Sequence, residues 1–446
     1  MAFPKDFVWG TATSSYQIEG GGLDYGRGEC IWHRFSHTPG KVYNGDTGDI
    51  ACDHIHRYPQ DVAMMAELGI DSYRFSVSWP RMIPAGTGTI NQQGLDFYKR
   101  LIESLQEANI TPYLTLYHWD LPQALQDKGG WENPDSVQWF MEYADLISRE
   151  LGSDVKDWIT HNEPFVVSMV SNLFGVHAPG QQDPVAAYTV AHHVLLSHGA
   201  AVPIIRQNVP DAEVGITLDQ TYSMPYRPDN HEDQIAARRF AAFHNDWFLE
   251  PVFRGTYPAD ALKELDQRGA LSKIDPTEIS KAQVPIDFLG INYYTRYVIK
   301  ASETDPSGFE QVRVDGTEHT ALDWEVYPDG LLHTLLYLHN AYYPTKIYIT
   351  ENGCSYDDPL PINGVVDDPK RVDYYRQHID AIEKAIELGV PVAGYFAWSL
   401  MDNFEWAEGY NRRFGLYHVD FETQERTPKK SALYYQERIS QERAKA

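Results

Sequence analysis

Two glutamates in this chain follow apolar segments, where a carboxylate is unexpected. Glu163 lies in "THNEP", and Glu351 follows the β-branched and aromatic run "IYIT" at residues 347–350. Desolvating a charge in such a place is costly, so a solvated turn is the simplest reading of either glutamate alone. Together, two acids can divide a reaction, because one donates a proton while the other, ionised, attacks or activates water.

Two further residues could separate the pKa values of these acids. Arg74 ends the segment "SYR" and carries a permanent positive charge that would keep a nearby carboxylate ionised. Tyr294 could donate a hydrogen bond to the same carboxylate. A protonated acid and an ionised one on either side of a bond are the equipment for cleaving a glycosidic linkage. The sequence therefore favours sugar hydrolysis, provided that the fold brings these residues together.

The elements that must position these residues repeat one pattern along the chain. An amphipathic helical stretch, a short stop containing Gly or Asn, and an apolar strand follow one another at 61–79, 101–119 and 378–400. Gly69 and Gly389 occupy the positions of helix C-cap glycines. Tight helix-to-strand connections of this kind indicate βα units and a parallel sheet.

Eight candidate strands can be counted, which is the number in a (β/α)8 TIM barrel. They cover residues 7–14, 71–79, 112–119, 155–163, 213–221, 287–295, 347–352 and 393–400. Such a barrel needs only about 250 residues. The surplus should therefore lie in long loops that build a deep pocket, with a β-excursion at 308–320. No Ser/Gly tract or charge block suggests a linker, so we expect residues 1–446 to form one α/β catalytic domain.

In a barrel of this kind, residues at the C-terminal ends of the strands carry the chemistry. These ends are polar, acidic and aromatic here: Gln17, His118, Trp119, Asn162, Glu163, Asn292, Tyr294, Glu351 and Trp398. The last strand leads into "DNFEW" at 402–406, which could instead begin a helix, because Asp402 and Asn403 are good caps. Any single tryptophan taken alone is more consistent with a place in the core than with a sugar platform.

Four long motifs resemble the signatures of glycoside hydrolase family 1, the retaining β-glucosidases. They are "FVWGTATSSYQIEGG" (7–21), "THNEP" (160–164), "IYITENG" (347–353) and "SLMDNFEWAEGYNRRFG" (399–415). The resemblance covers the whole chain, and the motifs come in the family's order. It implies hydrolysis of terminal non-reducing β-D-glucosyl residues from oligosaccharides and from aryl or alkyl β-glucosides by double displacement. Action on β-galactosides or β-fucosides, and transglycosylation, stay open.

The resemblance also implies a role for each matching residue. Glu163 would be the acid/base and Glu351 the nucleophile, positioned and tuned by Arg74, Asn292 and Tyr294. The residues implied to bind the non-reducing sugar are Gln17, His118, Trp119 and Asn162 at its hydroxyls, Trp398 beneath it, and Glu405 with Trp406 at O4 and O6. A non-catalytic sugar-binding barrel remains an alternative, although such a relative should have lost one of the two acids.

Three positions bear on which sugars are accepted. In the branch of the family that acts on 6-phosphorylated sugars, the position matching Glu405 is not acidic, so Glu405 favours unphosphorylated sugars over a 6-phospho-β-glucosidase. Phe165 stands where many relatives carry Trp, in the subsite that contacts the leaving group. Trp324 matches a second aromatic residue on that side, which would compensate in part. The aglycone preference is therefore left open.

The composition limits the kinds of partner that the protein is expected to bind. With 37 Lys and Arg against 63 Asp and Glu, the net charge is −26, which argues against nucleic acid or an anionic membrane. No run approaches the roughly 18 apolar residues of a membrane span. The partner that we expect is a small carbohydrate, and monomer and homo-oligomer are equally open.

The cysteines and histidines bear on compartment and cofactors. Three cysteines without a CxxC pair, and an N-terminus without the apolar core of a signal peptide, favour the cytoplasm. The histidines of "AHHVLLSH", at 192, 193 and 198, lack the i, i+4 spacing of a helical metal pair, and no P-loop or dinucleotide-binding glycine pattern follows a strand. The sequence therefore predicts neither a metal nor a cofactor.

Overall fold

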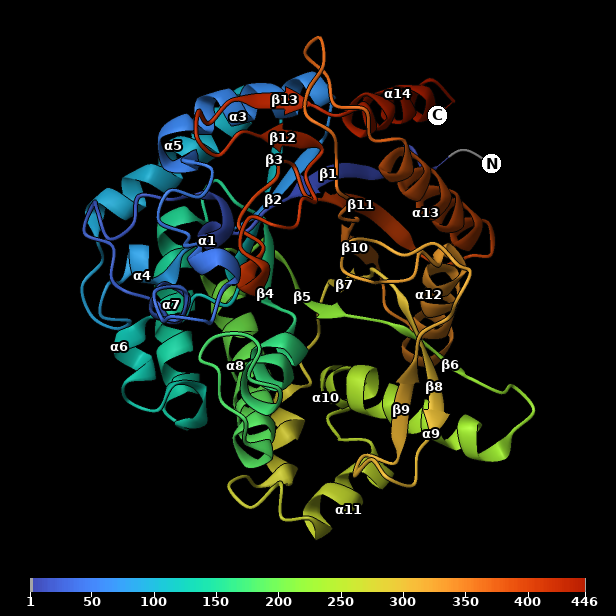
Figure 1. Ribbon diagram of the computed structural model, residues 1–446. Helices are drawn as coiled ribbons and strands as arrows, with labels where there is room; N and C mark the ends of the chain where they lie inside the picture. The colour runs from blue at the N-terminus through green and yellow to red at the C-terminus, as the bar shows by residue number, and fades with distance from the viewer. Residues whose placement is uncertain (1–2, 446) are drawn as a thin grey trace.

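The computed structural model describes residues 3–445 and places eight parallel strands in a closed barrel (Figure 1). Neighbouring strands follow the order β1-β11-β10-β7-β5-β4-β3-β2. Their bounds are β1 Val8–Ala12, β2 Ser72–Ser76, β3 Thr111–Tyr117, β4 Asp157–Asn162, β5 Glu213–Asp219, β7 Phe288–Asn292, β10 Ile347–Asn352 and β11 Val392–Trp398. The predicted (β/α)8 barrel is thereby confirmed, with each strand overlapping one predicted segment.

The predicted segments mostly run two or three residues past the ends of the observed strands. The segment 287–295, for example, becomes a strand only as far as Asn292, after which Tyr294 lies in a loop. At these C-terminal ends the backbone leaves the hydrogen-bonded ladder, which frees side chains to point into one common space. Glu163 and Tyr294, predicted within strands, therefore lie just beyond them, whereas Asn162, Asn292 and Glu351 lie inside their strands.

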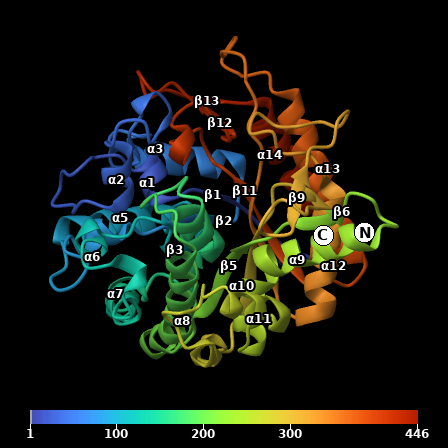
Figure 2. The ribbon, with the colours of Figure 1, turned by 60° about the horizontal axis from the view of Figure 1, so that its bottom comes forward.

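Helices surround the strands in Figure 1 and Figure 2 and join successive strands of the barrel. Gly69 ends α3 in the left-handed conformation, with φ of 71°, and Gly389 follows α13 with φ of 90°, so both predicted stops are confirmed. The helices are α1 Ser15–Ile18, α2 Ile31–Ser36, α3 His54–Leu68, α4 Trp79–Met82, α5 Gln92–Glu107, α6 Gln123–Gln126, α7 Ser136–Leu151, α8 Pro184–Asn208, α9 His231–Ala241, α10 Trp247–Arg254, α11 Ala259–Gln267, α12 Pro328–Tyr342, α13 Pro369–Glu387 and α14 Lys430–Lys445.

Large side chains fill the interior of the barrel, which is a packed core and not a pore. The aromatic residues Tyr113, Phe288, Tyr348 and Phe396 pack there, below the mouth of the barrel. Gly290 makes room for this packing, because a Cβ atom at its position would lie 2.4 Å from Thr217 Oγ1. The solid floor leaves the C-terminal mouth as the open end of the barrel.

The residues beyond the minimal barrel form long loops with their own structure. A three-stranded sheet combines β6 (Tyr222–Pro225), β8 (Arg296–Ala301) and β9 (Phe309–Val312) beside α9. The β-excursion predicted at 308–320 corresponds to β9, whereas its partners β6 and β8 were not predicted, because short half-exposed strands carry little hydrophobic pattern. A hairpin joins β12 (Tyr417–Val419) to β13 (Arg426–Pro428). None of the helices within residues 3–445 is long and apolar enough to cross a membrane.

A buried ionic network joins the end of the chain to the loops after β10 and β11. Lys429 Nζ lies 2.7 Å from carboxylate oxygens of both Asp402 and Asp358. Arg371 on α13 contacts Asp358 at 2.8 Å and Asp368 at 2.7 Å. Breaking a buried network by removing one partner leaves an uncompensated charge, which is strongly destabilising. Because Asp402 begins the segment that leads to Glu405, this network also holds one wall of the barrel mouth.

We expect Lys429→Met to lower the free energy of unfolding by about 3–5 kcal/mol, since it leaves one buried negative charge uncompensated, although Asp358 keeps Arg371 and Asp402 keeps Arg413. Lys430→Met is the matched control, because Lys430 pairs with Asp367 through side chains that are 52% and 63% exposed. The control should change stability by less than about 1 kcal/mol. Unfolding in urea and by heat measures both, and equal losses in the two variants would contradict the role of the network.

Candidate active site

Glu351 lies at the end of β10 and is held through both carboxylate oxygens. Its Oε1 accepts a hydrogen bond from Arg74 Nη1 at 2.7 Å, and its Oε2 accepts one from the Tyr294 hydroxyl at 2.6 Å. Only 3% of Glu351 is exposed, and Arg74 on β2 is buried with it. The fold thus brings to Glu351 the two partners that the sequence suggested for one of the acids.

Glu163 directly follows β4 and points into the same space. Its backbone is left-handed, with φ of 51°, and its N–H donates to the carbonyl of Thr217 at 2.9 Å. Its Oε1 accepts a hydrogen bond from Asn292 Nδ2 at 2.7 Å. Thr350, next to Glu351, donates to Asn292 Oδ1 at 2.8 Å and so fixes the orientation of that amide. Asn292 therefore ties the position of Glu163 to the strand that carries Glu351.

Asn162 links the remaining polar groups into one network. Its Oδ1 accepts hydrogen bonds from Arg74 Nη2 at 2.6 Å and from Asn292 Nδ2 at 3.1 Å. Its Nδ2 lies 3.2 Å from His118 Nε2, and its carbonyl accepts the indole N–H of Trp119 at 2.9 Å. Side chains from β2, β4 and β7 and from the loop after β3 are thereby fixed relative to one another.

The surroundings separate the pKa values of the two carboxyl groups. Burial raises the pKa of Glu163 well above its ordinary value, and repulsion from Glu351 and Asp219 raises it further. Burial also raises the pKa of Glu351, but Arg74 and the Tyr294 hydroxyl oppose that rise. Glu351 is therefore the group that ionises first, and Glu163 is the group that keeps its proton.

Aromatic rings form one wall of the space above the two acids. The His118 ring is stacked with those of Trp398 and Trp406, with centroid separations of 5.9 Å in both cases. Burial, and then Arg74, lower the pKa of His118 well below its ordinary value, so its imidazole is neutral. Among the described residues, none hydrogen-bonds to its Nδ1. This wall therefore offers flat apolar faces to a ligand.

Gln17 lies behind this wall rather than on the surface of the cavity. Its Nε2 donates to Asn403 Oδ1 at 3.1 Å and to the carbonyl of Phe404 at 2.9 Å, while its Oε1 accepts the Ser14 hydroxyl at 2.6 Å. The structure thus shows Gln17 supporting the segment that leads to Glu405. Its predicted contact with a sugar hydroxyl stays a prediction.

Glu405 reaches the cavity from the "DNFEW" segment, which forms a loop followed by a short 3-10 turn at Trp406–Glu408. Burial, followed by repulsion from Glu351 and Glu408, raises the pKa of Glu405 to about 8. The carboxyl therefore holds its proton at neutral pH in the unliganded protein. In that form it can donate one hydrogen bond and accept another, which suits two neighbouring hydroxyl groups.

A cavity of about 310 Å³ opens between these groups. The predicted residues that line it are His118, Trp119, Glu163, Phe165, Asn292, Tyr294, Trp324, Glu351, Trp398, Glu405 and Trp406. Gln17, Arg74 and Asn162 belong to the layer beneath and act on the cavity through the residues that they touch. The fold therefore gathers all fourteen predicted site residues around one space.

The sequence analysis missed several residues at the outer part of this cavity. Asp219 is the last residue of β5, and His244 Nε2 lies 3.3 Å from its Oδ2. The His244 ring packs 4.1 Å from that of Phe165, while Trp324 packs 5.2 Å from Tyr294. Asp219 could have been found as a strand end, whereas His244 lies in a π-helical turn, Ala242–Asp246, that no strand pattern marks.

Comparisons with known proteins agree with this geometry. The model of the family described as glycosyl hydrolase family 1 matches residues 1–444. Beta-glucosidase A of Acetivibrio thermocellus is 46% identical over 441 residues, which cover 98% of each chain. The solved family 1 β-glucosidase from Thermotoga maritima has a TM-score of 0.96 and 46% identity, with 99% of each chain covered. That enzyme in complex with isofagomine lactam has a TM-score of 0.95 at 46% identity, over 98% of each chain.

We expect Tyr294→Phe to raise the pKa of Glu351, because the lost hydroxyl donates to the ionised carboxylate. Removing a hydrogen bond to a charged group, at about 1.5–3 kcal/mol, corresponds to about one to two pKa units. If Glu351 must be ionised for activity, as predicted, the acid limb of kcat/KM against pH should move upward by that amount.

Tyr297→Phe is the matched control for this change. Tyr297 lines the same cavity, but its ring packs against Phe240 and His244 instead of contacting Glu351. Its loss should leave the acid limb in place. An unmoved acid limb in Tyr294→Phe would show that another group controls it.

Proposed function

The chain belongs to glycosyl hydrolase family 1 and is a β-glucosidase, and we propose that Glu351 is its nucleophile and Glu163 its acid/base. The observation that carries this assignment is that two buried carboxyl groups have different contacts and therefore different pKa values. Glu351 contacts a guanidinium and a hydroxyl, whereas Glu163 contacts an amide and two other carboxyl groups raise its pKa. Members of this family act with retention, which requires one ionised and one protonated acid.

In the first proposed step, Glu351 attacks the anomeric carbon of the bound glucoside. Glu163 donates its proton to the glycosidic oxygen as that bond breaks, and a covalent glycosyl-enzyme is formed. The positive charge of Arg74 and the hydroxyl of Tyr294 keep Glu351 ionised and aimed until the attack. Once the ester has formed, Glu351 is neutral, and its repulsion of Glu163 is gone.

The loss of that repulsion prepares the second step. With Glu351 esterified, the pKa of Glu163 falls, so Glu163 can accept the proton of a water molecule. The activated water attacks the anomeric carbon, the ester bond to Glu351 breaks, and glucose leaves with the β configuration. A sugar hydroxyl in place of water would give transglycosylation through the same intermediate.

The proposed contacts to the glucosyl unit follow from the positions around the cavity, except those of Gln17 and Asn162, which lie beneath its lining and are proposed from the family motifs. His118, Trp119, Asn162 and Gln17 would serve its hydroxyls, Trp398 would stack against its apolar face, and Glu405 with Trp406 would hold O4 and O6. Phe165 and Trp324, farther out, would contact the leaving group. Flat rings and neutral hydrogen-bonding groups match a neutral sugar, which presents apolar ring faces and a rim of hydroxyls.

We propose an unphosphorylated substrate because of the charges of the residues that line the cavity. The part of the cavity wall that residues 3–445 supply contains carboxyl groups but no lysine or arginine. Phosphate recognition in proteins relies on such cationic donors, and carboxylates nearby oppose it. A 6-phosphoglucoside would therefore leave its charge unpaired beside Glu405.

The proposed setting is a single catalytic domain in the cytoplasm. Cys30, Cys52 and Cys354 are all free and buried, which fits a reducing compartment. The proposed partner is a small carbohydrate such as a short β-glucoside.

We expect Glu163→Ala to lose activity and to regain it with azide on an aryl β-glucoside whose leaving group needs no proton. Azide attacks the glycosyl-enzyme without general-base help, and because that intermediate is α-linked the product should be β-glucosyl azide. The activity of Glu351→Gln should fall at least about 1,000-fold, since the covalent step is lost. Carbon-13 or proton NMR identifies the anomer, and α-glucosyl azide from Glu163→Ala would mean that the two roles are exchanged.

Glu408→Gln is the matched control for these carboxyl substitutions. Glu408 also lines the cavity, but its side chain is 41% exposed and it pairs with Arg412 at 3.5 Å. Its loss should change kcat/KM by less than about tenfold, the effect of about 1.4 kcal/mol.

We expect p-nitrophenol release from the β-D-glucoside and none from its 6-phosphate, in buffer containing EDTA. Initial rates on the galactoside and fucoside, measured beside them, rank the accepted sugars. Release from the phosphorylated substrate alone would contradict the proposal that the cavity accepts unphosphorylated sugars. Silence on all four substrates, with glucoside binding still seen by calorimetry, would support a non-catalytic sugar-binding barrel.

A further inference from the structure

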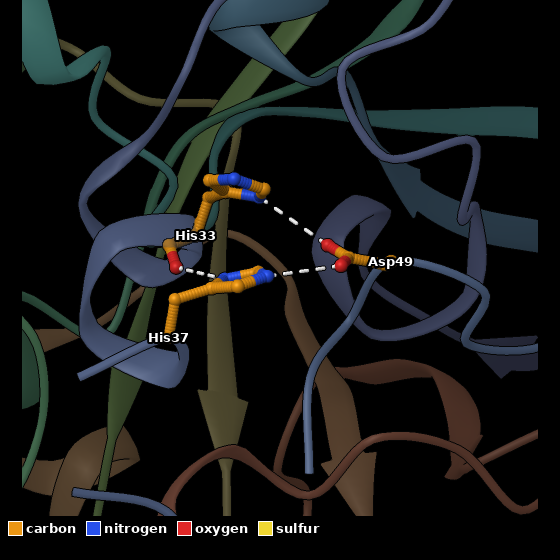
Figure 3. Close-up of side chains that lie close together, drawn as sticks. All are labelled: His33, His37 and Asp49. Carbon is orange, nitrogen blue, oxygen red and sulfur yellow. Dashed lines mark hydrogen bonds and ion pairs between the residues drawn. The ribbon is translucent and has the colours of Figure 1, made fainter. Parts of the chain in front are cut away.

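Two histidines at the end of α2 and an aspartate in the loop at 46–49 lie close together, and none of them lines the cavity. Figure 3 shows the imidazoles of His33 and His37, which come from one turn at the end of α2, facing the carboxylate of Asp49. His37 Nε2 lies 3.0 Å from Asp49 Oδ2, and His33 Nδ1 lies 3.3 Å from Asp49 Oδ1. One ligand atom from each residue lies within 4.8 Å of the other two.

The hydrogen bonds of His37 leave its Nε2 without a proton. Its Nδ1 lies 2.7 Å from the backbone carbonyl of His33, which can only accept, so the proton of a neutral imidazole must be on Nδ1. The lone pair of Nε2 then faces a carboxylate oxygen of Asp49. Two acceptors at this distance repel unless a cation lies between them or the imidazole takes a second proton.

His33 presents the same conflict. Within residues 3–445, neither His33 Nδ1 nor Asp49 Oδ1 has a hydrogen-bond partner, although both atoms are almost inaccessible to solvent. An unpartnered buried polar atom needs a physical explanation, and a bound ion is one that would provide it. Both histidines therefore aim a nitrogen at the Asp49 carboxylate, and these contacts are favourable only with a shared cation or with a second proton on each imidazole.

The spacing of these atoms fits a metal ion. Two donors on one tetrahedral zinc ion, at about 2.0–2.1 Å each, are separated by about 3.3 Å. The two observed nitrogen-to-oxygen distances, 3.3 and 3.0 Å, are close to that value. His33 and His37 also have the i, i+4 spacing of a helical metal pair. The carbonyl that accepts from His37 Nδ1 is the kind of outer contact that orients a ligating imidazole.

We propose that His33, His37 and Asp49 bind a borderline divalent transition-metal ion of the zinc type. Imidazole nitrogen and carboxylate oxygen are ligands that such ions accept, and the exposed side of the cluster leaves room for water to complete the shell. The proposed site differs from the prediction made from the sequence, for which a different set of histidines, at 192, 193 and 198, was considered. The proposal does not rest on the glycosidase function.

The ion would tie together two segments that support the sugar-binding wall. Trp32, next to His33, packs 4.6 Å from Trp406, and Tyr16 is stacked with Trp406 at 6.3 Å. Gly48, next to Asp49, lies so close to Tyr16 that a Cβ atom there would be 2.6 Å from its ring. We expect the ion to act on stability, by holding α2 against the loop at 46–49.

The test is a zinc titration of tag-free protein stripped with EDTA, at about pH 7.5, where imidazole is neutral. Calorimetry and elemental analysis should give one zinc per chain, and zinc should raise the unfolding temperature of the wild type. His37→Gln and Asp49→Asn should each weaken binding at least about tenfold and remove the shift in unfolding temperature. His33→Gln replaces either variant if it fails to fold, as judged by unfolding and glucoside hydrolysis in EDTA.

His56→Gln is the matched control. His56 is a 51% exposed histidine that pairs with Asp53, but within residues 3–445 no second histidine completes a cluster there. It should bind zinc as the wild type does. The proposal is overturned if the wild type binds no zinc, if His37→Gln and Asp49→Asn bind it unchanged, or if His56→Gln weakens binding equally.

Discussion

Two carboxyl groups buried in one small space at the mouth of the barrel are the constraint on which the rest of the site depends. Like charges in a poorly solvated space cannot both ionise at neutral pH, so the fold has to treat them differently. Arg74 and Tyr294 both reach Glu351, and Glu163 receives the amide of Asn292. The proposed division of roles between nucleophile and acid thus rests on contacts that exist before any substrate binds.

Those contacts demand a rigid frame, which the closed barrel supplies. Asn162 is in contact with Arg74, Asn292 and His118, so a shift of one strand would disturb several hydrogen bonds together. The strands have no free edge, and aromatic side chains pack the interior directly below the mouth. Buried polar networks are stabilising only when they are satisfied, which explains why this one draws on several different strands and loops.

The cavity is less charged than its list of acids suggests. Burial raises the pKa of Glu405 and of Asp219 to about 8 each, and that of Glu163 well above its ordinary value. At neutral pH most of these groups keep their protons, although the chain as a whole carries a net charge of −26. A neutral sugar therefore meets a wall of hydrogen-bonding groups and rings, not a strongly anionic pocket. The excess negative charge belongs to the rest of the surface.

The sequence by itself determined the eight strands, the ends of two helices at Gly69 and Gly389, and the acids at the ends of two strands. These are local patterns, set by side-chain periodicity and by the backbone freedom of glycine. The family motifs added roles for residues such as Trp398 and Glu405. Sequence could not show that Gln17 lies behind the wall, or that His244 meets Asp219.

The pairing of His33 and His37 with Asp49 likewise needed coordinates, because Asp49 comes from a separate loop. Only the tertiary structure decided which acid ionises first, because pKa values depend on burial and on charges that are distant in the chain. Arg74 and Glu351 are 277 positions apart in sequence and 2.7 Å apart in space.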